Sequence, residues 1–298
     1  SRMLPPIRRK CSGNRRRRRR KTPVSWRNFR FDADGPGGGE RPMIRNFRCV
    51  LRIAAVSIWF FLPAVWAALF NRRRDAAAYR RAARWTSYWA RVSARLCGIR
   101  VVAHGDPTAL SGGLLVSNHL GYLDVVSHAA LFPIRFAPKI ELKRTPVLGW
   151  LVGQSLPIWV DRGSRLKSAE VEREIERSLA LGQTTVVYPE GTTTDGEHGL
   201  LPFKSTPFEA AVKSGAAIQP LLTFYRSEPE GEGPLAWFGD ISMYKHIWHT
   251  LGIRRIRADV YILPILRAEP GEERKELAIR VHALMEREYW RIRQNEQA

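Results

Sequence analysis

The chain has 298 residues, of which 44% are hydrophobic, and its 49 Lys and Arg against 28 Asp and Glu give a formal net charge of +21. About 200 residues follow position 98, enough for one α/β domain. The three cysteines, Cys11, Cys49 and Cys97, are scattered and odd in number, which excludes a disulfide framework and a zinc site and is consistent with a reducing cytosol.

Half of the excess charge lies at the start of the chain. Residues 1–42 hold 14 Arg and Lys against three acidic residues, a net charge of +11. This Gly- and Arg-rich segment has little with which to form a core, so we predict a disordered basic tail. Because the chain opens with Ser1 and Met43 precedes an apolar segment, the tail is also interpreted as a mis-assigned start. A basic membrane- or nucleic-acid-binding protein without catalysis is the non-enzymatic alternative.

Residues 53–70 form an eighteen-residue run without a charged side chain, although Pro63 interrupts it. As a helix this segment would be about 27 Å long, so it either spans the bilayer or dips into one leaflet and returns. Arginines flank it at positions 45, 48 and 52 and at positions 72, 73, 74, 80, 81 and 84. The more basic following flank predicts that the rest of the chain lies on the cytoplasmic side of the inner membrane. A cleaved signal peptide is disfavoured, since no small-residue cleavage site follows.

Residues 75–99 mix five arginines with aromatic side chains, which are Tyr79, Trp85, Tyr88 and Trp89. This mixture fits an interfacial helix lying among lipid headgroups, with a core-packing helix as the alternative. Anionic lipid attracts basic residues beside an apolar segment by about 1 kcal/mol each, which favours membrane lipid over a specific nucleic-acid partner. We therefore predict a membrane-anchoring helical pair over residues 43–98 and a separate domain over residues 99–298.

This domain alternates short apolar runs with amphipathic ones. Strands are predicted near residues 100–103, 114–118, 134–137, 156–160, 184–188, 218–224 and 258–263. Helices are predicted at residues 168–181, 208–214 and 277–290, and Gly215 ends the second of them. Strands that alternate with helices predict an α/β fold whose mixed, mostly parallel sheet is covered by helices on both faces.

The first candidate site lies where strand 114–118 gives way to a helix, the position at which α/β proteins usually place their chemistry. His119 and Asp124 stand five positions apart there. At this spacing the imidazole can turn back onto the carboxylate. The carboxylate would fix the ring tautomer and leave the other nitrogen free to take a proton from a hydroxyl. The alternative is a helix cap with Asp124 in the first turn, where the dipole favours a negative charge.

A polar loop follows strand 184–188. Pro189 ends the strand, Glu190 comes next, and Gly191 lets the backbone turn sharply and approach a ligand closely. Three hydroxyl residues follow: Thr192, Thr193 and Thr194. Hydroxyl groups beside free backbone N–H groups can hold an anion or a polar headgroup. An ordinary surface turn is the alternative.

Two more segments complete the pattern. Strand 156–160 ends at Asp161 and Arg162, where the Arg could hold a phosphate or a carboxylate bidentately, with a surface ion pair as the alternative. Residues 217–224 have the pattern of a strand that Pro220 interrupts.

In this order and spacing, the four segments resemble the lysophosphatidate-type acyltransferase family, glycerolipid acyltransferases that esterify the hydroxyl of a lysolipid. The resemblance covers residues 50 to 265 approximately. The family's Asn-His-x4-Asp motif is matched at Asn118, His119 and Asp124, and its aromatic-Pro-Glu-Gly-Thr motif is matched over residues 188–192. The resemblance implies a glycerolipid acyltransferase-like fold for the catalytic domain.

The resemblance also implies roles for single residues. His119 would be the general base, Asp124 would orient it, and Glu190, Gly191 and Thr192 would shape the acceptor site. The hydroxyl would attack an acyl thioester directly, without an acyl-enzyme, a metal or a resident cofactor. Acyl-acyl carrier protein or acyl-CoA is the implied co-substrate. Acyl carrier protein is the expected partner, because it is acidic and a basic cytoplasmic face would attract it.

One position departs from the phosphatidate-forming members, whose third motif continues with an Arg credited with binding the acceptor phosphate. This chain has Thr193 there. Loss of such a charge-assisted hydrogen bond costs about 1.5–3 kcal/mol of binding free energy for a phosphate-bearing acceptor. An acceptor without a phosphate does not make this hydrogen bond and loses nothing. The surrounding residues look like the bacterial lyso-ornithine lipid acyltransferase branch, so we expect that acceptor, with Asp195 pairing its ammonium. The alternative is lysophosphatidate, bound by Arg162 with Lys139 or Lys204.

Overall fold

The computed structural model describes residues 42–70, 75–110, 112–146, 148–161, 165–231 and 233–295, all within one compact unit, Ala33–Ala298. Residues 1–41 of the predicted tail lie outside the described residues. One sheet has the strand order β1-β6-β5-β2-β4-β3. Its strands are β1 (Ile99–His104), β2 (Gly113–Ser117), β3 (Ile134–Phe136), β4 (Thr184–Val187), β5 (Ile218–Glu228) and β6 (Arg255–Ile262).

Neighbouring strands of this sheet run parallel, except β5 and β6, which are antiparallel. β5 is long enough to serve both partners: residues 218–221 pair with β2, and residues 221–228 pair with the returning β6. The predicted mixed, mostly parallel sheet is therefore confirmed. Each of these strands was predicted from its apolar run.

The prediction of a strand at residues 156–160 is wrong. Within the described residues this segment contributes a single bridge, from Val160 to Lys139. Two backbone N–H groups donate to the end of β3 and the residues after it, from Ile158 to the carbonyl of Phe136 and from Val160 to that of Pro138, each at 2.8 Å. Pro138 has no N–H to return to the carbonyl of Ile158, so the segment lies along the edge of the sheet without becoming a regular strand.

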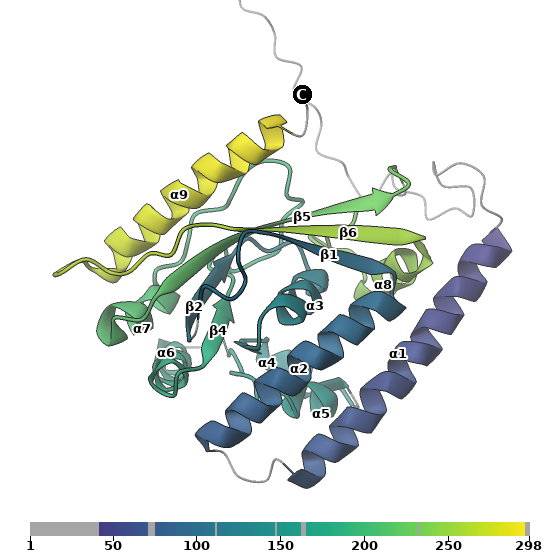
Figure 1. Cartoon of the computed structure of the whole chain (residues 1–298), viewed down its shortest axis with the longest axis horizontal. Helices are drawn as coiled ribbons and strands as arrows, with labels where there is room; N and C mark the ends of the chain where they lie inside the picture. Colours follow the sequence, from purple (N-terminus) through teal and green to yellow (C-terminus); the bar gives the residue numbers. More distant parts are fainter. Residues whose placement is uncertain are drawn as a thin grey trace, which may run out of the picture. The chain divides into compact units, whose positions relative to one another are not determined.

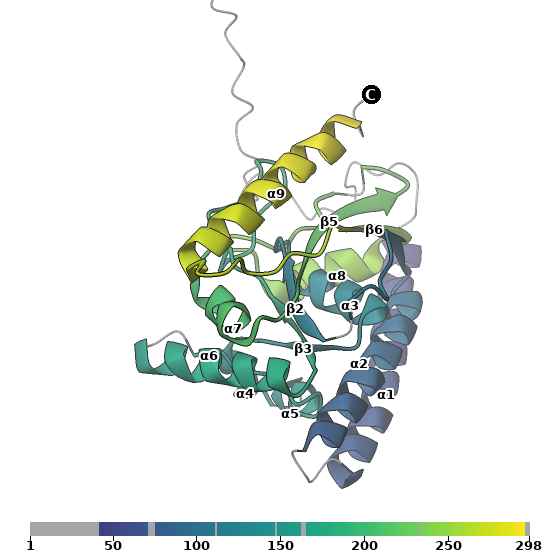
Figure 2. The same cartoon turned by 60° about the vertical axis from the view of Figure 1, so that its left-hand side comes forward.

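Helices cover both faces of the sheet (Figure 1, Figure 2). They are α1 (Pro42–Phe70), α2 (Ala76–Leu96), α3 (Tyr122–Leu131), α4 (Ile140–Lys143), α5 (Leu148–Gly153), α6 (Arg165–Ala180), α7 (Thr206–Ser214), α8 (Met243–Gly252) and α9 (Arg274–Asn295). α6, α7 and α9 are the three helices predicted after residue 99, and Gly215 ends α7 in the left-handed conformation, with φ 63°.

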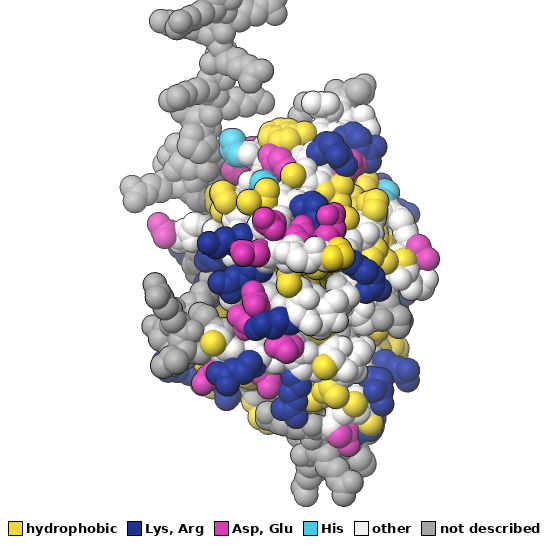
Figure 3. Space-filling view, turned by 90° about the vertical axis from the view of Figure 1, so that its left-hand side faces the viewer, with side chains coloured by type: hydrophobic (Ala, Val, Ile, Leu, Met, Phe, Trp, Pro, Cys, Tyr) yellow, Lys and Arg dark blue, Asp and Glu magenta, His cyan; other side chains and the backbone are white. Residues whose placement is uncertain are grey.

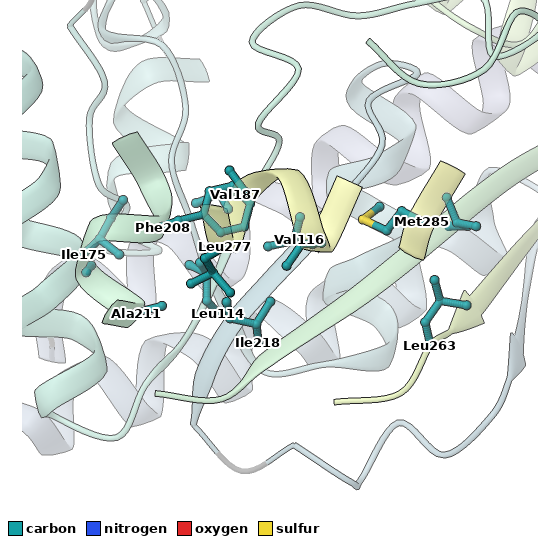
Figure 4. Close-up of a cluster of buried hydrophobic side chains, with 14 of the residues drawn as sticks. Leu114, Val116, Ile175, Val187, Phe208, Ala211, Ile218, Leu263, Leu277 and Met285 are labelled. Carbon is teal, nitrogen blue, oxygen red and sulfur yellow. The ribbon is translucent and has the colours of Figure 1, made fainter. Parts of the chain in front are cut away.

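Alternation along β2 explains two of the buried clusters. Leu114 and Val116 pack with side chains of α6, α7 and α9, whereas Leu115 packs with Ala90 of α2 and Ala129 of α3. Successive side chains of a strand point to opposite faces of the sheet. Figure 4 shows the first of these clusters. All residues of β2 are buried, so the carboxyl end of this strand is held from both sides.

α1 and α2 form the expected helical pair, and α1 begins at Pro42, before the apolar segment 53–70. Among the described helices, none combines the length and apolarity that crossing a membrane requires. Arg48 and Arg52, which the sequence places in a membrane flank, bind α8 instead. Arg48 Nη2 donates to the carbonyl of Gly252 at 2.5 Å, and Arg52 Nη1 to that of Leu251 at 2.9 Å. The last carbonyls of a helix lack intrahelical partners and carry partial negative charge, so these arginines attach α1 to α8.

Charge is distributed unequally over the surface. α1 and α2 together carry eight arginines and no acidic residue. On the side formed by α6, α7 and α9, Lys and Arg alternate with Asp and Glu (Figure 3). Lys213 lies 2.8 Å from Glu172 there, and Arg280 lies 2.6 Å from Glu272. The unbalanced positive charge of the described helices is therefore concentrated on α1 and α2.

Candidate active site

Residues 118–124 leave the sheet at the carboxyl end of β2, which lies between β4 and β5. The buried Asn118 makes two hydrogen bonds with the backbone of Thr223 on β5. It donates to the Thr223 carbonyl at 3.0 Å and accepts from the Thr223 N–H at 2.8 Å. The side-chain amide thus takes over the pairing of the sheet where β2 ends. It fixes the backbone from which His119 projects.

His119 and Asp124 are paired, with 2.7 Å between His119 Nδ1 and Asp124 Oδ2. Gly121 permits the turn between them, because its φ is 152° and a Cβ there would lie 3.1 Å from Trp237 Cβ. Asp124 lies in the first turn of α3, and its Oδ2 also accepts the N–H groups of Leu120 at 2.7 Å and Gly121 at 3.0 Å. The sequence offers two alternative roles for Asp124, a helix cap and the partner of His119. In the structure its carboxylate makes both contacts.

Asp124 is fully buried, and its second oxygen, Oδ1, accepts a 2.7 Å hydrogen bond from the Tyr225 hydroxyl. Burial raises the pKa of such a carboxyl, but the hydrogen bond and the charge of His119 outweigh it. The pKa of Asp124 therefore ends below its ordinary value. Asp124 is a carboxylate at neutral pH, able to keep a proton on His119 Nδ1 and to stabilise an imidazolium.

The imidazole of His119 stacks on the Tyr188 ring, with centroids 4.1 Å apart and planes inclined by 15°. The His119 side chain is 24% exposed. Within the part of the chain that the structure describes, its Nε2 has no hydrogen-bond partner. Since Nδ1 is occupied by Asp124, Nε2 is the nitrogen that can take a proton from a substrate hydroxyl.

A second histidine, His128, lies behind this pair, one helical turn after Asp124 on α3. It is 0% exposed, with 3.0 Å between Nδ1 and the Tyr188 hydroxyl and 2.8 Å between Nε2 and Thr223 Oγ1. Burial lowers the pKa of His128 to about 4, so the ring is neutral. None of the four motifs includes this histidine. The spacing of four from Asp124, which puts both side chains on one helix face, was the available signal.

Glu190 follows β4, the strand next to β2, and is 5% exposed. Its Oε1 accepts the backbone N–H of His119 at 2.9 Å, and its Oε2 accepts the backbone N–H of Leu201 at 3.0 Å. Burial raises the pKa of this carboxyl. Both oxygens are engaged with backbone groups, so Glu190 holds the loop that carries His119.

The rest of the loop after β4 closes around the same residues. Gly191 has a φ of 74°, and a Cβ there would collide with the side chain of Lys204. The Lys204 N–H donates to the carbonyl of Pro189 at 2.9 Å, and the Thr194 N–H donates to that of His119 at 2.9 Å. The structure thus brings His119, Glu190, Gly191 and Lys204 together.

The other predicted site residues are more exposed than Asp124 and Glu190 or lie outside the described residues. Thr192 and Lys139 are exposed, and Thr193 is half-buried. Lys139 follows β3, which runs parallel to β4, so it lies at the same edge of the sheet as the loop 189–196. Asp195 accepts the N–H of residue 197 at 3.0 Å and pairs with the neighbouring His198 at 3.0 Å. Arg162 lies outside the described residues.

The chain resembles known proteins over this region. Residues 100–223 match the protein-family profile described as Acyltransferase. The chain is 32% identical to the lyso-ornithine lipid O-acyltransferase of Rhodobacter capsulatus, over 65% of this chain and 73% of that protein. It is 27% identical to the 1-acyl-sn-glycerol-3-phosphate acyltransferase of Neisseria gonorrhoeae, over 58% of this chain and 68% of that protein.

The fold is also found in a solved structure, the 1-acyl-sn-glycerophosphate acyltransferase from Thermotoga maritima. The two superimpose with a TM-score of 0.63 over 84% of this chain and 97% of that one, at 18% sequence identity. The matched family segment, residues 100–223, contains His119, Asp124 and Glu190. The chain therefore belongs to the acyltransferase family that includes the lysophosphatidate and lyso-ornithine lipid enzymes, and it is an enzyme that transfers acyl groups.

Proposed function

We propose that the protein is a membrane-bound O-acyltransferase that moves a fatty acyl group from an acyl thioester to the hydroxyl of a lysolipid, with His119 as general base. The observation that carries this proposal is the pair itself. Asp124 occupies Nδ1 of His119 from a buried position, while the ring remains partly exposed. This arrangement leaves Nε2 free to accept a proton from a bound hydroxyl.

The reaction follows from these atoms. Nε2 accepts the proton of the lysolipid hydroxyl as its oxygen attacks the thioester carbonyl, and a tetrahedral intermediate forms. Its collapse breaks the C–S bond, and the imidazolium returns the proton to the departing thiolate. The ester and the free thiol leave together, so no acyl group is bonded to the protein. Asp124 stabilises the imidazolium throughout, because its charge lies 2.7 Å from the ring.

His119→Ala tests this mechanism, and His104→Ala is a matched control. His104 on β1 is also paired with a buried carboxylate, 2.6 Å from Asp259, but it lies on the strand at the far edge of the sheet from β3 and β4. We expect His119→Ala to lose acyl transfer measured in detergent and His104→Ala to keep it. Acyl transfer by His119→Ala at the wild-type rate would refute the proposed base.

For the acceptor we propose lyso-ornithine lipid. Thr193 stands where phosphatidate-forming members carry an Arg, and a relative named for lyso-ornithine lipid is 32% identical to this chain. The ornithine headgroup brings a carboxylate and an ammonium instead of a phosphate, and the hydroxyls of Thr192 and Thr193 offer it neutral hydrogen bonds. Because Asp195 already pairs with His198, an ornithine ammonium would have to displace that exposed imidazole.

Lysophosphatidate is the second candidate, because the relative from Neisseria gonorrhoeae is named for 1-acyl-sn-glycerol-3-phosphate. Lys204, which lies against Gly191, is the cation next to the loop, with Lys139 at the same edge of the sheet. Pure enzyme offered both acceptors separates the candidates. Acylation of lysophosphatidate with lyso-ornithine lipid left unchanged would show that the argument from Thr193 is wrong.

For the donor we propose acyl-acyl carrier protein, with acyl-CoA as the alternative. Both are anionic, so the net charge of +21 attracts either one. An acidic carrier protein contacts more basic residues than CoA does. Turnover with acyl-acyl carrier protein should therefore fall more steeply than turnover with acyl-CoA as the salt concentration rises. Turnover with each donor at low and moderate salt decides the matter, and preference for acyl-CoA at every ionic strength would exclude the carrier protein.

We further propose that α1 and α2 hold the enzyme at the cytoplasmic face of the inner membrane, with the lipid acceptor still in the bilayer. α1 exposes large apolar side chains along its length, among them Met43 at 74%, Phe47 at 64% and Ile58 at 66%. α2 adds the exposed aromatic rings of Trp85 and Tyr88. Apolar and aromatic side chains beside arginines are the composition of helices that lie in the lipid interface.

A further inference from the structure

Tyr225 belongs to none of the four motifs, yet its hydroxyl lies 2.7 Å from Asp124 Oδ1. It stands on β5, in the part of that strand that pairs with β6, opposite Ala258. Thr223, which pairs with Asn118 and His128, lies two residues earlier. Side chains two apart on a strand share a face, so β5 places both residues beneath α3.

The two oxygens of Asp124 are used differently. Oδ2 accepts three donors, namely His119 Nδ1 and the N–H groups of Leu120 and Gly121. Oδ1 accepts the Tyr225 hydroxyl. Burial and the nearby carboxylate raise the pKa of Tyr225 well above its ordinary value, so the phenol keeps its proton and acts as the donor. The hydrogen bond fixes the plane of the carboxylate and draws part of its charge away from His119.

We infer that Tyr225 is a positioning residue that sets the orientation and the effective charge of Asp124, and through Asp124 the basicity of His119. This inference rests on the proposed role of His119 as the base. Without the phenol, Oδ1 would be an unsatisfied buried oxygen, and the full charge of the carboxylate would act on the ring. The imidazolium would then be more stable, and His119 would accept a proton at higher pH.

Tyr225→Phe tests the inference. We expect kcat to fall about ten- to a hundred-fold, because the Asp124 carboxylate, and with it the His119 ring, loses its fixed orientation. KM should stay near the wild-type value, because Tyr225 contacts Asp124 and not the substrate. The acidic limb of the pH profile of kcat should move to higher pH, which loss of packing alone would not cause.

Tyr122→Phe is the matched control. Its hydroxyl is also removed from a partly buried site beside the same helix start, but its partners are His246 at 3.0 Å and Thr250 at 3.2 Å. The control should melt at a lower temperature and keep the wild-type pH profile. A shift of equal size in both variants would overturn the inference.

A double substitution tests whether Tyr225 acts through Asp124. In an Asp124→Asn background, Tyr225→Phe should have little further effect on kcat, whereas two independent residues would give multiplied losses. If Tyr225→Phe does not fold, site-specific 3-fluorotyrosine at position 225 keeps the shape and strengthens the donor. Its acidic limb should then move to lower pH, and an unmoved limb would overturn the inference.

The outcomes also separate this inference from the proposed function. An active His119→Ala variant refutes His119 as the base. An inactive His119→Ala together with a folded Tyr225→Phe enzyme of wild-type kcat and pH profile leaves that base intact and refutes only the role of Tyr225.

Discussion

Asp124 owes its position to the shortness of its side chain. From the first turn of α3 it reaches back to the N–H groups of Leu120 and Gly121 while it meets the ring of His119. A capping carboxylate is favoured at a helix start by the dipole, and here the same charge faces an imidazole. The stability of the turn and the chemistry of the site therefore depend on one group.

Asp124→Asn separates these two roles. The amide oxygen can still accept from the backbone N–H groups and from His119, so the cap is kept. The amide carries no charge, and its NH2 group must face the Tyr225 oxygen. We expect kcat to fall by about 10²- to 10⁴-fold, as when a neutral amide replaces the carboxylate behind a catalytic histidine. Thermal melting should show a folded protein, and a wild-type kcat would mean that the charge of Asp124 is not used.

Which site residues the sequence predicts depends on how far apart they stand along the chain. His119 and Asp124 were found because a spacing of five lets them meet locally. Tyr225 lies 101 positions from Asp124, and only the pairing of β5 beside β2 brings it there. No local pattern marks such a residue. The partners of Glu190 also lie far from it along the chain or carry no side-chain signal, because its carboxylate accepts the backbone N–H groups of His119 and Leu201.

At the scale of elements, strands were predicted more reliably than helices, and α8 shows the reason. Its buried residues include His246, His249 and Thr250, while Tyr244 is 73% and Trp248 43% exposed. In α8 polar side chains face the core and large aromatic side chains face outward. The helix therefore lacks the apolar core-facing stripe by which a helix is predicted from sequence. Segment 156–160 gives the opposite error, since its apolar run, which is only partly buried, lies at the sheet edge and makes a single bridge.

The contact between α1 and α8 can be tested through Arg52. Its guanidinium donates to the carbonyls of Leu251, Ile253 and Arg254 at 2.9, 2.5 and 2.8 Å. Arg52→Ala should lower the free energy of unfolding by about 1–3 kcal/mol, because carbonyls at and just after the end of α8, two of them in partly buried hydrogen bonds, lose their donors. Arg52→Lys should recover only part, since an ammonium lacks the planar fork. Chemical denaturation in detergent measures both.

Arg80→Ala is the control for Arg52. Arg80 is an exposed arginine of α2, and its removal deletes the same side chain. We expect its stability to match that of the wild type. Equal losses for Arg52→Ala and Arg80→Ala would mean that α1 is not attached to α8 through these hydrogen bonds.

At the scale of the whole molecule, the sheet order explains why separate motifs make one site. The candidate residues follow β2 and β4, which are neighbours and parallel, so their carboxyl ends meet at one edge. This part of the architecture follows from the alternation of strands and helices in the sequence. The antiparallel return of β6 onto β5 does not, because nothing in the apolar pattern of a strand records its direction.

Acid stability is also a property of the whole fold, through the buried histidines His128, His246 and His249. Burial lowers the pKa of each from 6.5 to about 4. Between these two values the unfolded chain binds protons that the folded chain does not, so stability present above pH 6.5 is lost as pH falls towards 4. The melting temperature should decline across that window, and His246→Gln should flatten the decline. A melting temperature that stays constant from pH 7 to pH 4.5 would contradict the assignment of neutral buried rings.

The proposed membrane attachment predicts that one face of α1 contacts lipid. Phe47 and Ile58 are 64% and 66% exposed and stand eleven positions apart on α1, three turns along one face. If this face lies in the lipid interface, Phe47→Glu with Ile58→Glu should weaken binding to anionic vesicles more than ten-fold, because each apolar side chain contributes about 1.5–3 kcal/mol when buried. Ile279→Glu on α9 is the control, since Ile279 is 70% exposed on the charge-balanced side of the fold. Vesicle co-sedimentation measures all three proteins. Equal binding by the wild type and the α1 double variant would place the lipid contact elsewhere, and an equal loss in Ile279→Glu would mean that the added charge repels lipid from any position.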